Sequence, residues 1–180
     1  MAGHIPDSKA TTWLTPMRIV EPVHEFYGPP KLDPCSSPYS LMKANVNFML
    51  PEHDGLVESW NQYPTAYINP PFGRGIDKWI GKCAETGRGG CEVIALIPAY
   101  VDTKVWQDVV FPTSQAICYI RGRLKFLLPP DTPDSTDKPK EGPAPMGCAL
   151  VYWGSYTSRF VSIFRDKYKI GHITCTYQNR

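Results

Sequence analysis

The sequence lacks the marks of several common protein classes. No two of its six cysteines stand in Cys-x-x-Cys spacing, so a zinc site is not expected. No apolar run approaches the length of a membrane span. The segment from Met1 to Ala10 also has no apolar core of the length found in signal peptides. We therefore expect a cytoplasmic protein with reduced thiols.

Strong net charge is missing too. The formal net charge is only +2, which argues neither for nor against a nucleic-acid partner. Basic residues nonetheless gather at Arg121, Arg123 and Lys125. Such a group can contact phosphates or can be an ordinary solvated surface, and charge alone does not decide between the two.

The length of 180 residues is enough for one compact domain and leaves little room for a second. We expect a flexible lead over residues 1–12 and a single domain over residues 13–180. The 19 prolines are about twice the usual share, so stiff and irregular connections are expected. Residues 128–147 are rich in proline and polar residues without apolar periodicity, which predicts a long loop.

Apolar patterns predict helices that alternate with strands. Apolar residues at helical spacing predict helices over residues 16–27, 76–86, 103–110 and, less regularly, 159–170. Short apolar runs predict strands at 31–33, 46–50, 66–68, 93–97, 116–120 and 148–153. We expect residues 121–126 to continue the strand before them, and we assign no element from Gly171 onward. The alternation predicts an α/β protein with a three-layer, mostly parallel sheet and helices on both faces.

The Asn-Pro-Pro-Phe block, residues Asn69 to Phe72, follows the strand predicted at 66–68. Neither proline has an N–H to donate, so the strand must stop there. The Asn69 amide oxygen and the proline carbonyls can accept hydrogen bonds, and Phe72 offers an aromatic face. This combination suits a planar group that carries an NH2, such as adenine or an amide. A simple Pro-Pro turn after an edge strand would have the same four residues.

Several polar residues fall at the predicted carboxyl ends of strands, where open α/β sheets bind ligands. They are Asp33, Asp54 and Asn69, with Pro98 at the corresponding place on a fourth strand. Each carboxylate can also be an ordinary strand-end or turn residue. Tyr100, just after Pro98, can line a pocket there or belong to the core.

Seven motifs occur in a fixed order along the chain. They are Trp13-Leu-Thr-Pro16, Leu32-Asp-Pro-Cys-Ser-Ser-Pro38, Asp54-Gly-Leu56, Trp60, Asn69-Pro-Pro-Phe-Gly73, Arg121-Gly-Arg-Leu-Lys-Phe126 and Ala144-Pro to Tyr152-Trp-Gly154. In this order the chain resembles the phage-encoded DNA N6-adenine methyltransferases, over residues 13–154. The resemblance implies a Rossmann-like methyltransferase domain in a host bacterial cytoplasm, S-adenosylmethionine as methyl donor, and adenine in double-stranded DNA as acceptor.

The resemblance also implies roles for residues. Asn69, Pro70, Pro71 and Phe72 match the catalytic block. The residues expected to bind the methyl donor are Thr15, Pro16, Asp33, Cys35, Ser36, Asp54 and Asn69. DNA contacts are expected at Arg74, Arg121, Arg123 and Lys125, and no metal is expected. The chain departs from the general methyltransferase pattern after Asp33, where Pro34, Cys35 and Ser36 replace a glycine-rich turn.

The block suits amine methylation because it orients a weak nucleophile without a strong base. Hydrogen bonds to Asn69 and to the Pro70 carbonyl would aim the lone pair of the adenine amine at the methyl group. Because that amine is out of reach inside a duplex, the adenine must be flipped out. Two alternatives remain open at the level of sequence: methylation of a glutamine amide on a protein, and a DNA-binding relative without activity.

Overall fold

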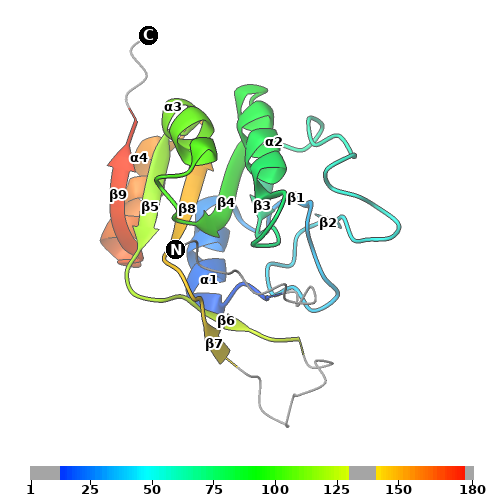
Figure 1. The fold of residues 1–180 in the computed structure, drawn as a ribbon, viewed down its shortest axis with the longest axis horizontal. Helices are drawn as coiled ribbons and strands as arrows, with labels where there is room; N and C mark the ends of the chain where they lie inside the picture. The colour runs from blue at the N-terminus through cyan, green and yellow to red at the C-terminus, as the bar shows by residue number, and fades with distance from the viewer. Residues whose placement is uncertain (1–12, 130–140, 177–180) are drawn as a thin grey trace.

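The computed structural model describes residues 13–129 and 141–176 (Figure 1). The predicted lead at residues 1–12 and the greater part of the predicted loop at 128–147 lie outside these ranges. No helix in the described part of the chain is both long and apolar enough to span a bilayer.

A seven-stranded sheet forms the centre, in the order β2-β1-β3-β4-β8-β5-β9. The strands are β1 Leu32–Asp33, β2 Val46–Asn47, β3 Thr65–Ile68, β4 Glu92–Pro98, β5 Ala116–Ile120, β8 Cys148–Trp153 and β9 Gly171–Cys175. Strand β1 pairs in parallel with β2 and β3, and β3 pairs in parallel with β4. Strand β8 is antiparallel to β4 and β5, and β9 is antiparallel to β5. Strands β1 to β5 therefore run in one direction, and only β8 and β9 oppose them.

Helices cover both faces of this sheet (Figure 1). They are α1 Met17–Tyr27, α2 Ile76–Arg88, the π-helix η1 Trp106–Val110 with α3 Phe111–Thr113, and α4 Thr157–Val161 with the π-helix η2 Ser162–Lys167. Alternate residues of a strand face opposite sides, so β4 contributes to two apolar cores. Ile94 and Leu96 pack in one core with α1 and α4. Val93 and Ala95 pack in the other with α2 and η1. This burial on both faces explains the unbroken apolar run predicted as a central strand.

The strand order reverses between β1 and β3. From β1 the chain goes on to β2 at one edge, whereas from β3 it goes on to β4 on the opposite side. Open sheets bind ligands in the crevice that such a reversal leaves at the carboxyl ends of the strands. The residues that follow Asp33 and Ile68 therefore occupy the position where a ligand site is expected.

Two expectations about local structure were wrong, and one strand was not predicted. Residues 121–126 do not continue β5, because the chain turns at Gly122, which has a left-handed φ of 73°. A separate antiparallel pair, β6 Lys125–Leu127 and β7 Glu141–Pro143, follows instead, and β7 lies inside the predicted loop. Strand β9 was missed because its side chains alternate between buried and exposed over only five residues at the sheet edge.

Helix α1 begins one residue later than predicted, at Met17, with Pro16 at its N-cap. The Thr15 hydroxyl does not cap the helix and bonds to the hydroxyl of Tyr67. Pro22 lies inside α1, which still runs through Tyr27. The predicted helix at 159–170 is confirmed as α4 with η2, and the mostly parallel direction of the strands is confirmed as well.

Candidate functional site

The Asn69 side chain is held in one orientation at the end of β3. Its amide Nδ2 donates a 2.8 Å hydrogen bond to the backbone carbonyl of Trp13. Only the nitrogen of an amide can donate to a carbonyl, so this bond decides which end of the side chain is the oxygen. No residue in the described ranges donates to Asn69 Oδ1 or to the Pro70 carbonyl. Two neighbouring acceptors are thus left for a ligand.

The segment that carries Trp13 is fastened at three points. Leu14 pairs with Leu127 of β6 through backbone hydrogen bonds of 2.8 and 3.2 Å. The Thr15 hydroxyl lies 3.0 Å from the hydroxyl of Tyr67, a buried residue of β3. Together with the bond to Asn69, these contacts fix residues 13–15 across the carboxyl end of β3.

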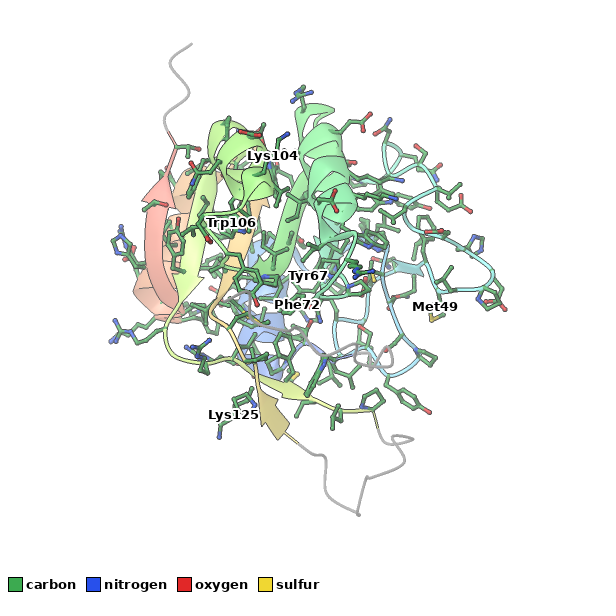
Figure 2. The ribbon with its side chains drawn as sticks, in the orientation of Figure 1. Met49, Tyr67, Phe72, Lys104, Trp106 and Lys125 are labelled. Carbon is green, nitrogen blue, oxygen red and sulfur yellow. The ribbon has the colours of Figure 1, made fainter. Side chains whose placement is uncertain are left out.

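Phe72 lies between an aromatic group and a small cavity. Its ring meets the edge of Phe126 at a centroid distance of 5.7 Å, and Phe126 in turn contacts Trp13 at 6.1 Å. Figure 2 shows Phe72 near Tyr67, and both belong to the same apolar core region. On another side, Phe72 lines an apolar cavity of about 110 Å³ together with Tyr100. Tyr100 therefore lines a pocket, which was one of the two roles open to it.

Asp33 is a buried carboxylate at the end of β1, only 4% exposed. Burial raises its pKa to about 6, against the opposing effect of hydrogen bonds from the Cys35 N–H and from the Ser36 and Ser40 hydroxyls. No cationic side chain of the described residues pairs with it. A buried carboxylate without a counter-ion is costly and is typical of a site that receives a positively charged ligand.

The Asp54 segment packs directly against the Asp33 segment. A Cβ built on Gly55 would lie 1.8 Å from the Pro34 carbonyl oxygen, so only glycine permits this approach. Asp54 Oδ1 accepts a 2.8 Å hydrogen bond from the Leu56 N–H, which orients the carboxylate. The segments that carry Asp33 and Asp54, both predicted from the sequence as ligand-binding, therefore lie side by side.

Gly55→Ala tests this close approach. We expect a loss of about 1–3 kcal/mol in the free energy of unfolding, because the new methyl group must displace the Pro34 backbone. Urea denaturation measures the loss. Gly81→Ala is the matched control, since a Cβ at Gly81 meets nothing within 4 Å and alanine favours the interior of α2. A Gly55→Ala protein as stable as the wild type would contradict the packing described.

Comparison with known proteins adds a decisive observation. The family model of DNA N-6-adenine-methyltransferase (Dam) matches residues 2–172. The chain belongs to this family. No curated protein and no solved structure matches the chain. Membership in the Dam family makes DNA adenine methylation the function of the chain and confirms the resemblance seen in its motifs.

The basic residues of this Dam-family chain lie at the sheet edge that carries the Asn-Pro-Pro-Phe block. Arg121 follows β5, which points to the same sheet edge as β3. Arg123 and Lys125 follow it and are exposed, and Phe126 next to them touches Phe72. Figure 2 shows Lys125 on the outer side of the small β6–β7 sheet. Arg74, two residues beyond Phe72, is exposed as well.

Three residues of the site were not predicted: Trp13, Tyr67 and Phe126. Trp13 contributes its backbone carbonyl, and no side-chain pattern can signal such a role. The sequence around Tyr67 predicts only a strand residue, because the contact between its hydroxyl and that of Thr15 joins distant segments. Phe126 belongs to a motif shared with the family, which was a usable signal, but its contact with Phe72 spans 54 positions of sequence.

Proposed function

We propose that this Dam-family chain transfers the methyl group of S-adenosylmethionine to the N6 amine of an adenine flipped out of double-stranded DNA. The observation that carries the proposal is the pair of acceptors, Asn69 Oδ1 and the Pro70 carbonyl, left by the Asn69–Trp13 hydrogen bond. We further propose that residues 13–180 form one three-layer, Rossmann-like domain, which two apolar cores on opposite faces of the sheet support. A DNA substrate would place the protein in a bacterial host's cytoplasm.

The residues around Asp33 fit the methyl donor, which when bound supplies an electrophilic methyl group on a sulfonium. The unpaired Asp33 carboxylate suits the ammonium of the donor's methionine part. Thr15, Pro16, Cys35 and Ser36 would bind the same part. Burial raises the pKa of the Cys35 thiol to about 12, so this cysteine stays protonated and packs without acting as a nucleophile.

Asp54 would bind the adenosine part of the donor. One of its carboxylate oxygens accepts from the Leu56 N–H, and a carboxylate has further lone pairs for ligand hydroxyl groups. The contact of Gly55 with Pro34 keeps this carboxylate beside the Asp33 segment. The two segments would therefore bind opposite parts of one extended ligand.

The Asn-Pro-Pro-Phe block would act on the adenine amine. Its nitrogen is a weak nucleophile because the lone pair is delocalised into the ring. Hydrogen bonds from the two amine protons to Asn69 Oδ1 and to the Pro70 carbonyl would favour a tetrahedral nitrogen with a directed lone pair. Once methylated, the nitrogen loses a proton readily, so no strong general base is needed. Stacking on Phe72 would contribute roughly 1–3 kcal/mol.

DNA would contact the basic residues beside the block. Arg74, Arg121, Arg123 and Lys125 are exposed, and three of them lie on the segment that carries Phe126. Contacts to phosphates release counter-ions, so the affinity for DNA should fall steeply with salt concentration. These residues would position the duplex while the block holds the flipped base.

Labelled methyl donor tests the proposal directly. The purified chain is incubated with S-adenosylmethionine carrying a labelled methyl group, and with either duplex DNA or a mixture of proteins. The proposal predicts label in DNA, in N6-methyladenine, and none in protein. Label on glutamine amides of proteins, with unlabelled DNA, would overturn the assignment of the acceptor.

A further inference from the structure

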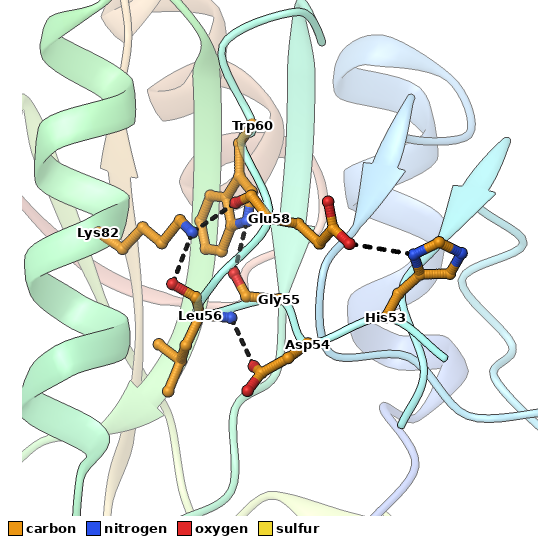
Figure 3. Close-up of polar contacts among 7 residues, drawn as sticks. All are labelled: His53, Asp54, Gly55, Leu56, Glu58, Trp60 and Lys82. Carbon is orange, nitrogen blue, oxygen red and sulfur yellow. Dashed lines mark hydrogen bonds and ion pairs between the residues drawn. The ribbon is translucent and has the colours of Figure 1, made fainter. Parts of the chain in front are cut away.

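Lys82 is a residue of α2 that the function has not yet used. Its side chain lies over the segment that carries Asp54 (Figure 3). The ammonium donates to the backbone carbonyl of Leu56 at 2.9 Å and to that of Glu58 at 2.5 Å. It also lies 5.1 Å from the ring centroid of Trp60. One side chain thus contacts three residues of the segment that follows Asp54.

Trp60 makes a second set of contacts with the same segment. Its indole N–H donates to the Gly55 carbonyl at 2.8 Å. Its ring stacks on Trp79, one turn before Lys82 on α2, at a centroid distance of 6.2 Å and an interplanar angle of 28°. Residues 54–60 therefore contact α2 in two ways, through the Lys82 ammonium and through the stacked pair of Trp60 and Trp79. The indole hydrogen bond of Trp60 stabilises the turn within this segment.

The surroundings of the ammonium are acidic. Burial lowers the pKa of Lys82, and the nearby carboxylates of Asp54, Glu85 and Glu58 oppose this effect. A charged donor in a partly buried place makes stronger hydrogen bonds to carbonyls than a neutral donor does. Lys82 is thus the positively charged side chain that binds two backbone carbonyls of this acidic segment.

Helix α2 connects this contact to the chemistry. The helix begins at Ile76, four residues after Phe72, so its first turn follows the Asn-Pro-Pro-Phe block. Its second turn, through Lys82, holds the Asp54 segment. The approach of Gly55 to Pro34 leaves that segment no room to move inward. We propose that Lys82 is a positioning residue that keeps Asp54 against residues 34–36 for binding of the methyl donor, an inference that rests on the proposed function.

Lys82→Met tests the inference, because methionine keeps an apolar stem but removes the charge and the N–H donors. We expect the dissociation constant for S-adenosylmethionine, measured by calorimetry, to rise about tenfold or more. At saturating donor, kcat and the KM for DNA should stay within about twofold, since neither the block nor the basic residues touch Lys82. Lys82→Arg keeps charge and donors and should recover most of the affinity.

Lys78→Met is the matched control. Lys78 lies one turn earlier on α2 and is exposed, and its side chain makes no hydrogen bond or ion pair within the described ranges. This variant should bind the donor like the wild type. Equal donor affinity in Lys82→Met and wild type would overturn the role of Lys82 and leave the proposed function standing. So would a loss of kcat and donor affinity together, or no recovery in Lys82→Arg. A wild-type protein that binds no S-adenosylmethionine would instead overturn the proposed function.

Discussion

Asn69→Ala is expected to abolish measurable methyl transfer while the protein still binds the methyl donor. The substitution removes the acceptor Oδ1 and also the Nδ2 that bonds to the Trp13 carbonyl. Removing one preorganised polar group that acts in the transition state costs about 10²–10³-fold in kcat. Loss of the bond to Trp13 adds to this, because residues 13–15 then lose one of their three attachments.

Two measurements separate catalysis from binding in this variant. A single-turnover assay with labelled donor and duplex DNA reports transfer, and calorimetry reports the affinity for the donor. Asn61→Ala removes an exposed asparagine and controls for the loss of an amide. Asn69→Asp keeps an acceptor but places an oxygen against the Trp13 carbonyl, so it should retain only part of the activity. Near-normal turnover in Asn69→Ala would show that the block is not the catalytic centre.

Asp33→Asn is expected to weaken donor binding and, at the same time, to stabilise the folded protein at alkaline pH. In the folded state burial raises the pKa of Asp33 to about 6 from an ordinary value of 3.8. The folded protein therefore holds this proton more tightly than the unfolded chain does. The resulting stabilisation is fully present below about pH 4 and is lost as the pH rises through 6. By pH 8 the difference amounts to about 3 kcal/mol.

Asparagine has the same shape and no charge, so it avoids that loss. Urea denaturation should find Asp33→Asn more stable than the wild type at pH 8, by up to about 3 kcal/mol, with the difference shrinking towards pH 4. Calorimetry at pH 8 should find weaker binding of the donor, because its ammonium loses an anionic partner. Asp102→Asn removes an exposed carboxylate and controls for net charge. A variant that is less stable than the wild type at pH 8 would contradict an unpaired, buried Asp33.

The sequence predicted the features that depend on local chemistry. Two prolines cannot extend a sheet ladder, so Asn69 had to stand at the end of a strand, as it does after β3. An apolar run without alternation had to be buried on both faces, as Val93 to Ile97 are. The sequence also predicted that Asp33 stands at the end of a strand, as it does in β1.

Features that depend on contacts between distant segments could not be predicted. The bond between Asn69 and Trp13 joins residues 56 positions apart. The reason that residue 55 is glycine lies in the Pro34 carbonyl, not in the turn itself. Strand β8 inserts between β4 and β5 in the antiparallel direction, and an apolar run carries no sign of its direction. Lys82 binds two carbonyls of a segment that lies 24 and 26 positions before it, and no sequence pattern indicates these partners.

We propose that the acceptors at Asn69 and Pro70 direct a methyl group to adenine N6 in DNA. Long-read sequencing of DNA from a methylation-deficient bacterial strain that expresses the protein tests it most directly, since it reports both activity and target motif. We expect N6-methyladenine at a defined sequence in cells that express the wild type, and none in cells that express Asn69→Ala. Unmodified DNA with the wild type, or equal methylation with the variant, would contradict it.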